Sequence, residues 1–515
     1  MKMNIAILNR AGRWFGRGYM MKPSNLFRRL AGSLPGVLLL CLLAANGRAQ
    51  TFTTLHTFTG GSDGSTPVGG LILSGNTLYG AAELGGGSGY GTVFAINTDG
   101  TGFYRLESFN GVNNEAYPCN LLLSGNTLYG GSQGPGVTIG ALFAVNTNGT
   151  GFTTLHTFTT ISAPHYTNSD GGEVFGQLIL SGNTLYGASS VGGTGGSGNV
   201  FAVNTNGTGL TILHNFTAPS TAFNPLAGTV LPPNTNSDGA FPNDGVILSG
   251  DTLYGTTGCG GSWGWGTVFA VSTNGTGFTN LYSFTGGSDG AFPYAGLILS
   301  GNTLYGTACW GGTNRSGTVF ALNTDGTGFA VLHVFTATNI PYSVTLPPPS
   351  KTNSDGAWPV GGLILSGNTL YGTMWLGGSS GHGTVFAMNT DGTGFTTLHN
   401  FTGGKDGANP QAALILSGNT LYGMARYGGI HGDGTVFSLS FPPQLAIIPS
   451  ETNVILTWPT NYAGFDYTGY TLESTTNLGS SAVWTTNSPP PVVVNGQNTV
   501  TNPISGSQTF FRLSQ

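Results

Sequence analysis

The stretch G-L-I-L-S-G-N-T-L-Y-G, residues 70–80, decides the fold, because the chain repeats it almost unchanged six more times. The ten-residue copies begin at residues 121, 178, 246, 297, 363 and 414. Ser-Gly-Asn-Thr at the centre is typical of a two-residue hairpin turn, and the flanking apolar triplets are typical of short strands. An array of small, similar sheets is therefore expected.

The residues that follow each copy complete a four-stranded antiparallel meander. In the first repeat, a glycine-rich loop over 81–91 leads to a third strand over 92–97. Asp99-Gly100 then supplies a second tight turn, expected to be of type I′, before a fourth strand over 103–109. A single meander cannot bury both faces, whereas meanders stacked around an axis can. We therefore predict an all-β fold with a seven-bladed β-propeller and no helix after residue 50.

The strand signatures also predict how the ring closes. The third-strand signature Thr-Val-Phe-Ala and the fourth-strand signature Leu-His-x-Phe each occur seven times, in variant forms. The Asp/Asn-Gly turn that joins them occurs only six times, and the last third strand runs instead into Pro442-Pro443. The unmatched fourth strand is residues 52–58, so we expect the N-terminal strand to complete the last blade.

Length variation is confined to one connection. From the Ser of each Ser-Gly turn to the Phe that ends the fourth strand there are 34 or 35 residues, whereas from that Phe to the next turn there are 15 to 33. The variable connection lies on the same face as the glycine-rich loop. This face is either a binding face or a place where longer loops are tolerated, and the sequence favours neither.

Composition limits the classes of function. Only 6% of the residues are charged and the net charge is −5, which gives no reason to expect a nucleic-acid partner. Basic residues precede an apolar run over 34–45, and Gly47-Arg48-Ala49 resembles a cleavage site. We predict a signal peptide over 1–49, with an uncleaved anchor as the alternative, and a secreted or outer-surface protein with no transmembrane span in the mature chain.

The repeat pattern stops after the propeller region, which we place at residues 50–441. Residues 442–515 contain six or seven short β-rich runs separated by Pro and Gly, which predicts a small β-sandwich. Trp458 and Tyr470 are its expected core aromatics, and the segment resembles fibronectin-III/Ig-like modules.

The motifs LILSGNTLYG, GTVFA-x-NT-[DN]-GTGF and SDGA-x-P, spread over about residues 51–441, resemble the GloVer-type tandem-repeat family of secreted bacterial proteins. The resemblance implies β-propeller-like repeats with a variable C-terminal module. It implies no catalytic activity.

Repeated polar residues are interpreted as structural. One aspartate per repeat stands before Gly at the start of an inner strand and is expected to make an Asx-turn, with Ca²⁺ binding as the alternative. The six are Asp63, Asp170, Asp238, Asp289, Asp355 and Asp406. A histidine recurs on the fourth strand at residues 56, 156, 214, 333 and 399, where packing is favoured over metal binding.

The remaining candidates lie in the glycine-rich loops. Aromatic rings there suit stacking on a sugar or a protein, with packing between blades as the alternative. The candidate ligand-binding residues are Trp263, Trp265, Trp310, Trp375, Arg426, Tyr427, His431 and Asp433. Cys259 and Cys309 lie in adjacent loops, and a disulfide between them is a further hypothesis.

We therefore expect a monomeric, cofactor-free binding or scaffolding protein whose loop-rich face contacts a polysaccharide or a surface protein. The alternative is an extracellular carbohydrate-active enzyme, a lyase or glycoside hydrolase, with its site at the propeller mouth. The sequence identifies no catalytic residue.

Overall fold

The computed structural model describes residues 6–9, 50–112, 115–135, 139–162, 165–220, 235–338, 352–450, 452–476, 478, 482–503 and 508–514. The chain divides into two compact units, Phe52–Ser440 and a second unit that contains Phe441–Gln515 together with Met1–Thr51. Over the described ranges the regular elements are all β-strands, as expected.

The repeat unit contains seven four-stranded antiparallel sheets within its described residues. The first strands of the sheets are β3 (Ser65–Ser74), β7 (Ala116–Ser124), β11 (Ile179–Ser181), β15 (Ile247–Ser249), β19 (Ile298–Ser300), β23 (Ile364–Ser366) and β27 (Ile415–Ser417). The second strands are β4 (Thr77–Leu84), β8 (Thr127–Gln133), β12 (Thr184–Ser189), β16 (Thr252–Thr257), β20 (Thr303–Ala308), β24 (Thr369–Met374) and β28 (Thr420–Ala425). The third strands are β5 (Thr92–Asn97), β9 (Ala141–Asn146), β13 (Asn199–Asn204), β17 (Thr267–Ser272), β21 (Thr318–Asn323), β25 (Thr384–Asn389) and β29 (Thr435–Ser440). The fourth strands are β6 (Tyr104–Ser108), β10 (Thr153–Thr157), β14 (Thr211–Asn215), β18 (Thr279–Ser283), β22 (Ala330–Val334), β26 (Thr396–Asn400) and β2 (Thr51–Thr57).

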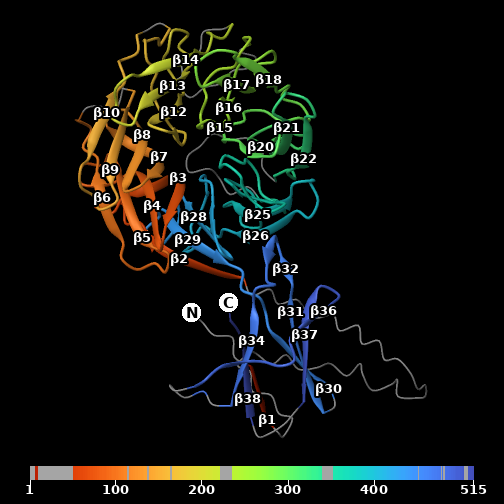
Figure 1. Ribbon diagram of the computed structural model, residues 1–515. Coiled ribbons are helices and arrows are strands. Elements are labelled where there is room, and N and C mark those ends of the chain that lie inside the picture. The colour runs from red at the N-terminus through yellow and green to blue at the C-terminus, as the bar shows by residue number, and fades with distance from the viewer. Residues whose placement is uncertain are drawn as a thin grey trace. The chain divides into compact units, whose positions relative to one another are not determined.

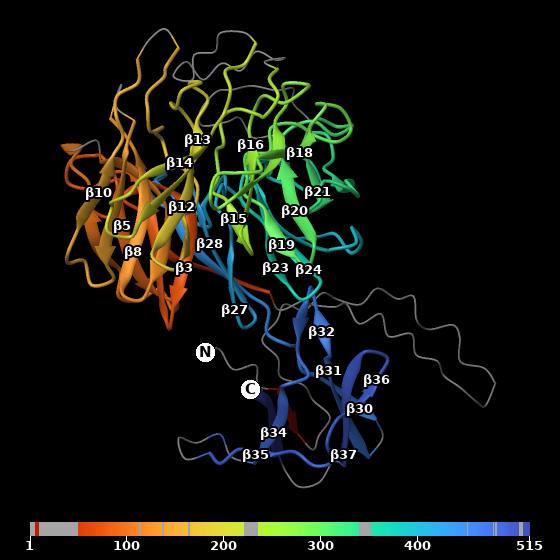
Figure 2. The same ribbon diagram turned by 45° about the horizontal axis from the view of Figure 1, so that its top comes forward.

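The sheets, numbered 1 to 7 in this order, have a propeller-like arrangement. Figure 1 shows them succeeding one another around a common centre, with the first strands innermost. Figure 2 shows the same unit turned about the horizontal axis. The described parts of the second-to-third-strand loops and of the connections between sheets share one side of the unit, since Gly86 N donates to Gly61 O at 2.8 Å and Asn236 N donates to Gly261 O at 3.2 Å.

Sheet 7 is assembled from both ends of the repeat unit. Its strand order is β2-β29-β28-β27, so the N-terminal strand lies beside β29 as the strand count predicts. Phe58 N donates to Gly434 O at 3.0 Å, and Phe52 stacks on Phe437 with 5.3 Å between the ring centroids.

The two hairpin turns follow different rules. Ser74 pairs with Thr77 across the two-residue loop, and Gly75 has φ of 57°, which fits a type II′ turn. The type I′ expectation for the Asp-Gly turn is wrong, because only Gly100 has positive φ there and Gly100 N donates to Asn97 O at 2.9 Å. This is a type I turn followed by a left-handed glycine, and Asp99 stabilises it by accepting a hydrogen bond from Thr101 N at 2.9 Å.

A glycine and a phenylalanine from adjacent strands interlock in every sheet. Gly80 on β4 pairs with Phe94 on β5, and Phe94 is fully buried. A Cβ at Gly80 would lie 2.6 Å from the Phe94 ring, so only glycine leaves room for that ring. The same pair recurs with the rings of Phe143, Phe201, Phe269, Phe320, Phe386 and Phe437. It explains why the glycine of Thr-Leu-Tyr-Gly is invariant among the repeats.

The second unit contains two further four-stranded sheets. One has the order β30-β31-β37-β36, formed by Ala446–Ser450, Asn453–Pro459, Gln497–Pro503 and Val492–Val494. The other has the order β1-β38-β34-β35, formed by Ala6–Asn9, Gln508–Ser514, Thr471–Thr475 and Thr485–Thr486. A two-stranded sheet pairs β32 (Asn461–Tyr462) with β33 (Phe465–Asp466).

Both larger sheets contribute to one core around Trp458, which is fully buried as predicted. Tyr470 is only half-buried, so its assignment as the second core aromatic is wrong. Phe511 is the second aromatic residue of this core. Tyr467 is also buried, and its hydroxyl donates to Phe441 O at 2.7 Å. β1 lies within the predicted signal peptide, most of which is outside the described residues.

Candidate functional site: the central channel

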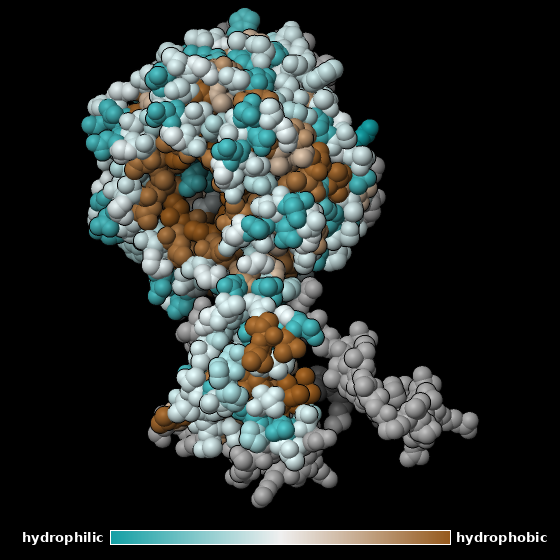
Figure 3. Space-filling view, turned by 45° about the vertical axis from the view of Figure 1, so that its right-hand side comes forward, coloured by the Kyte–Doolittle hydropathy of each residue, from teal (hydrophilic) through white to brown (hydrophobic). Residues whose placement is uncertain are grey.

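The repeat unit encloses a cavity of about 1010 Å³ that residues from all seven sheets line. Figure 3 shows a hollow bordered largely by hydrophobic residues. Aliphatic residues of the innermost strands form much of the wall, among them Leu71, Ile179, Ile247 and Ile364. The volume is large enough for a small organic ligand or the end of a polymer.

A strained residue positions the lining in every sheet. At the entry to each innermost strand, one non-glycine residue adopts φ between 51° and 61°. The seven are Thr66, Tyr117, Glu173, Phe241, Phe292, Trp358 and Asn409. In each case the backbone N–H donates to a carbonyl oxygen in the second-to-third-strand loop of the preceding sheet, at 2.7 to 2.9 Å. For Thr66 the acceptor is Asp433, which links sheet 1 to sheet 7.

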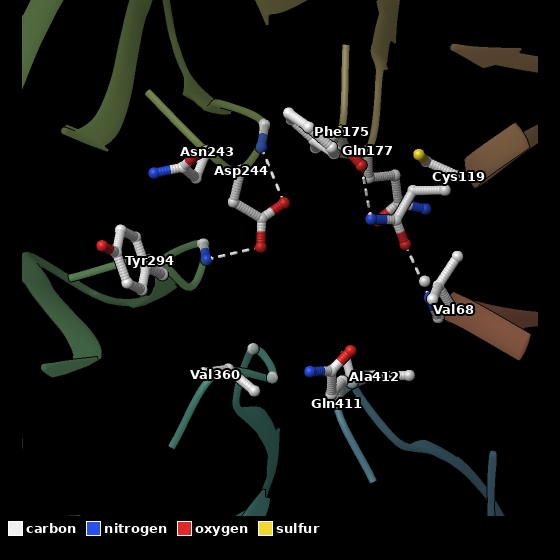
Figure 4. A pocket seen from close by; sticks show the side chains of 18 of the residues that line it. Val68, Cys119, Phe175, Gln177, Asn243, Asp244, Tyr294, Val360, Gln411 and Ala412 are labelled. Carbon is white, nitrogen blue, oxygen red and sulfur yellow. Dashed lines mark hydrogen bonds between the residues drawn. The ribbon is translucent and has the colours of Figure 1, made fainter. Parts of the chain in front are cut away.

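The turn made by this strained residue directs a lining position toward the axis. The position lies two residues after the strained residue, and all of its seven occupants line the cavity: Val68, Cys119, Phe175, Asn243, Tyr294, Val360 and Gln411. Figure 4 shows them arranged around the channel. Nearly identical repeats thus place different side chains at one equivalent position.

The residue three positions after the glycine of Thr-Leu-Tyr-Gly is equally varied. Its occupants are Glu83, Gln133, Ser190, Gly258, Cys309, Trp375 and Arg426. Glu83, Gln133, Ser190 and Arg426 line the cavity. Cys309 and Trp375 belong to a hydrophobic cluster that also contains the lining residues Tyr294 and Val360.

Sheets 7, 1, 2 and 3 form the polar side of the channel. Arg426 Nη2 donates to Glu83 Oε2 at 2.6 Å, and Arg426 Nη1 donates to Gln411 Oε1 at 2.7 Å. Glu173 interacts with Ser190, and burial raises the pKa of the Glu173 carboxyl above its ordinary value. Burial likewise raises the pKa of the nearby Cys119 thiol to about 12, so this cysteine is a neutral thiol at physiological pH.

Two side chains tie the inner loops of neighbouring sheets together (Figure 4). Asn120 accepts from Gly70 N at 2.6 Å and donates to Phe175 O at 2.9 Å. Asp244 accepts from Gly245 N at 2.7 Å and from Gly296 N at 2.6 Å. Burial raises the pKa of Asp244, although these backbone hydrogen bonds oppose the shift.

Sheets 4, 5 and 6 carry a group of aromatic residues. Trp265 stacks on Trp310 with 5.6 Å between centroids, and Phe292 stacks on Tyr294 with 5.8 Å. Trp358 and Trp375 lie 5.7 Å apart by their centroids, and Trp375 Nε1 is enclosed without a hydrogen-bond partner. Of these residues Tyr294 lines the cavity, and the tryptophans pack among one another outside the lining.

The structure separates the candidate residues suggested by the loop sequences. Of the eight candidate ligand-binding residues, all of which the structure describes, Arg426 alone lines the cavity. Trp265, Trp310 and Trp375 are half-buried in aromatic contacts, whereas Trp263 has 58% of its surface exposed. The Arg426 guanidinium lies 5.6 Å from the Tyr427 ring centroid, Asp433 Oδ1 accepts from Ser65 Oγ at 2.8 Å, and His431 is exposed. These residues do not converge in one cleft with Arg426.

The repeated aspartates and histidines form pairs. His56, His156, His214, His333 and His399 contact Asp63, Asp170, Asp238, Asp355 and Asp406 respectively through Nε2, at 3.0 to 3.2 Å. The remaining aspartate, Asp289, accepts a hydrogen bond from the Tyr282 hydroxyl at 3.0 Å instead. A neighbouring threonine also donates to each aspartate, as from Thr217 N to Asp238 Oδ2 at 3.1 Å. Each pair therefore braces the connection between two sheets.

The disulfide hypothesis for Cys259 and Cys309 is wrong, since both residues are buried and free. Counted with the Thr of Thr-Leu-Tyr-Gly as the first residue, Cys309 is the seventh residue in its repeat, whereas Cys259 is the eighth in its own. Successive side chains in extended backbone point to opposite sides. Cys259 accordingly packs with Ala240 and Phe241, and Cys309 packs with Ala357 and Trp358.

Among the described residues, no three or more His, Cys, Asp or Glu side chains are grouped closely enough to hold a metal ion. The described part of the chain also has no helix with the length and hydropathy needed to cross a membrane.

Sequence reasoning missed the channel-lining position after the strained residue. A signal was present, because this is a place where otherwise faithful repeats differ from one another. Val, Cys, Phe, Asn, Tyr, Val and Gln succeed one another there. What was missing was the knowledge that these side chains point to the axis.

Comparisons with known proteins identify a family. The model of a family described as the Gloeobacter/Verrucomicrobia repeat matches residues 45–236, 227–347 and 348–447. No curated protein matches the chain. An oligogalacturonate lyase solved in complex with manganese is 9% identical, with 77% of this chain and 94% of that chain covered and a TM-score of 0.44. A putative 6-phosphogluconolactonase from Bacteroides uniformis is 16% identical, with 74% and 92% covered and a TM-score of 0.40.

Proposed function

The chain belongs to the Gloeobacter/Verrucomicrobia repeat family, and we propose that in this member the repeats close into a seven-bladed β-propeller whose central channel binds part of a carbohydrate chain. The observation that supports this proposal is that some positions are identical in all seven repeats, whereas others differ from repeat to repeat. Thr-Leu-Tyr-Gly, which builds the core, is the same in all seven repeats, whereas the lining position has six different residue types. Recognition of an asymmetric ligand accounts for differences that packing does not require.

The chemistry of the lining favours a sugar. Amide and carboxylate groups such as those of Gln133, Asn243 and Glu173 suit hydrogen bonds with adjacent hydroxyls. Aromatic side chains such as Tyr294 and Phe175 suit contact with the apolar face of a pyranose ring. A ligand that has both hydroxyl groups and an apolar face matches this mixture of lining residues.

The same proposal includes the setting of the protein. We propose that residues 1–49 direct secretion and that the mature protein acts outside the cytoplasm as a monomer. We also propose that residues 442–515 form a fibronectin-III/Ig-like β-sandwich. The single core shared by its two larger sheets supports this assignment.

A second candidate is a carbohydrate-active enzyme with its site in the channel. Glu83 and Glu173 both line the cavity, and the raised pKa of Glu173 would suit a general acid. Release of shortened oligosaccharides from a bound substrate would favour this candidate over binding alone.

Titration calorimetry with the full chain tests the binding proposal. Oligosaccharides selected on a glycan array are titrated into the wild type, a channel variant, Tyr294→Ala, and a rim variant, Trp263→Ala. We expect Tyr294→Ala to weaken binding at least about tenfold, the size of effect that loss of one buried aromatic contact has. Trp263→Ala should bind as the wild type does. The reverse pattern would place the site on the loop-rich face, and an absence of binding to every glycan would reject the proposal.

A further inference from the structure

The charges along the channel are unequal. Three carboxyl groups line the cavity, those of Glu83, Glu173 and Asp244, but Arg426 is the single lysine, arginine or histidine among the described lining residues. An anionic ligand would therefore enter a region with an excess of acidic groups. A ligand with a positive charge would relieve that excess.

The Arg426 guanidinium already has hydrogen-bond partners within the protein. It donates to Glu83 at 2.6 Å and to Gln411 at 2.7 Å, and its Nε is enclosed without a hydrogen-bond partner. A ligand carboxylate would have to displace Glu83 from Arg426 before it could form a bidentate pair. Arg426 and Glu83 therefore act as one neutral unit that presents no free positive charge.

Of the three lining carboxyl groups, that of Glu173 has the fewest partners to offset a negative charge. Asp244 accepts hydrogen bonds from two backbone N–H groups, and Glu83 has Arg426. Within the described part of the chain, Glu173 has the Ser190 hydroxyl as its one side-chain partner, and it sits at the positive-φ position that recurs in every sheet, with φ of 52°.

From this arrangement we infer that the channel takes a carbohydrate that carries an ammonium group, an amino sugar, with the ammonium group paired to Glu173. The inference rests on the proposed function and specifies its ligand. The lining aromatics Tyr294 and Phe175 are compatible with the same ligand, because aromatic faces attract cations as well as the apolar faces of sugars. Acidic sugars are disfavoured by the same charges.

Titration calorimetry of the full chain with three tetrasaccharides tests the inference. The probes are the tetramer of glucosamine, which is cationic, the tetramer of N-acetylglucosamine, which is neutral, and the tetramer of galacturonate, which is anionic. At pH about 6 and low ionic strength, we expect the cationic tetramer to bind at least about tenfold more tightly than the neutral one, as one partly buried ion pair would give. The anionic tetramer should not bind.

Two variants identify the partner of the ammonium group. Glu173→Gln keeps the shape of the side chain and removes its charge, so it should reduce the cationic tetramer to the affinity of the neutral one. Asp325→Asn makes the same charge change in an exposed hairpin turn and should have no effect. If Glu173→Gln does not fold, the wild type still supplies a test, because added salt should weaken binding of the cationic tetramer and not of the neutral one.

The outcomes separate the two proposals. Equal binding of the cationic and neutral tetramers would overturn the amino-sugar inference and leave carbohydrate binding in place. Tighter binding of the anionic tetramer would overturn the inference as well. Binding of none of the tetramers, together with a glycan array without hits, would reject the carbohydrate proposal itself.

Discussion

The histidine–aspartate pairs show how a few polar residues hold the connections between sheets. His214 Nε2 lies 3.0 Å from Asp238 Oδ2, and the His214 ring stacks on Phe278 of the next sheet with 3.6 Å between centroids. Tyr282 likewise donates a hydrogen bond to Asp289, and its ring stacks on Phe329 with 3.8 Å between centroids. An aromatic ring with a hydrogen-bonding group therefore fills this position in six of the seven sheets, and Glu107 stands there in sheet 1.

The chain supplies a matched test of what this position requires. His214→Tyr copies the Tyr282 solution and should leave the free energy of unfolding within about 0.5 kcal/mol of the wild-type value. His214→Leu removes one partner of a nearly buried carboxylate and should cost about 1–3 kcal/mol. Denaturant unfolding of both variants measures the difference. Equal losses for the two would show that tyrosine does not replace histidine at this position.

The same pairs set the dependence of stability on pH. Burial alone would raise the pKa of Asp170, Asp238, Asp355 and Asp406, but hydrogen bonds from the partner histidine and threonine outweigh it and hold each pKa below 3.8. Burial lowers the pKa of His56 below 6.5 despite its contact with Asp63. All of these groups bind protons less readily in the folded state than in the unfolded chain.

The contribution of these groups to folding stability should therefore fall on acidification. The contribution of His56 is fully present above about pH 6.5 and is lost as pH falls through its lowered native pKa. The contribution of the aspartates is fully present above about pH 4 and is lost as pH falls through their native values, which gives the steeper decline. The raised pKa values of Glu173 and Asp244 act in the opposite direction, and their effect is complete by about pH 4. Melting temperatures recorded from pH 8 down to pH 3 measure the balance, and a melting temperature that does not fall between pH 4 and pH 3 would contradict this account.

The strained residues differ in how well they suit a left-handed conformation. Thr66 is β-branched, has φ of 51°, and its hydroxyl is buried without a hydrogen-bond partner. Asn409 at the equivalent place has φ of 59° and donates to Trp375 O at 2.8 Å. Asparagine tolerates this region better than a β-branched residue does.

Exchanging the two residue types should move stability in opposite directions. Thr66→Asn should stabilise the protein by about 1 kcal/mol, because it relieves strain and removes an unsatisfied hydroxyl. Asn409→Thr should destabilise it by a similar amount. Chemical unfolding of the two single variants measures both changes. A loss of stability in Thr66→Asn would mean that the threonine makes a contribution beyond its backbone.

At the scale of the element, two kinds of glycine occur in each hairpin. A Cβ at Gly306 would lie 2.6 Å from Phe320 Cζ and 2.9 Å from Leu297 Cδ2, in ordinary strand backbone. Gly301, in the preceding turn, has φ of 58° and open space around it. Glycine is needed at the first position for volume and at the second for backbone conformation.

These two reasons predict different rescues. Gly306→Ala should cost about 1–3 kcal/mol through overpacking, and adding Phe320→Leu should recover part of that loss. Gly301→Ala should cost about 1 kcal/mol through backbone strain, and Phe320→Leu should not recover any of it. A double-variant cycle measured by thermal unfolding decides between them. Equal coupling in both pairs would reject the distinction.

Elements were more predictable from the sequence than the channel was. The strand positions follow from the two-residue alternation of apolar side chains and from the turn residues between the strands. The pairing of residues 52–58 with the last third strand follows from the number of strand signatures. The Cys259–Cys309 error came from a one-residue difference in register, which reverses the direction of a side chain. The identity of Glu173 as a lining residue depends on a left-handed turn that neither glycine nor asparagine marks. Nothing in the local sequence announces that turn.

At the scale of the whole molecule, the proposed ring depends on one seam where the two ends of the repeat unit meet. β2 completes sheet 7, and Phe52 of this strand stacks on the His399 ring at 4.1 Å. Across the same seam, Thr66 N donates to Asp433 O at 2.8 Å, and Arg426 pairs with Glu83 at 2.6 Å. The ion pair that shapes the channel is thus also a link between the first and the last sheet.

A chain that begins at Phe58 lacks β2 and tests whether closure stabilises the whole unit. Without β2, the backbone groups of β29 become an open sheet edge, which is a template for pairing with other chains. We expect a lower melting temperature, a less cooperative transition and association in solution, measured by calorimetry and light scattering. A peptide of residues 50–58 added in excess should restore the transition, because it supplies the missing strand. A peptide with Phe52→Ala and His56→Ala should restore less, since it lacks the side chains that anchor the strand. A shortened chain that remained monomeric and melted as the full chain does would show that the sheets hold together without the seam.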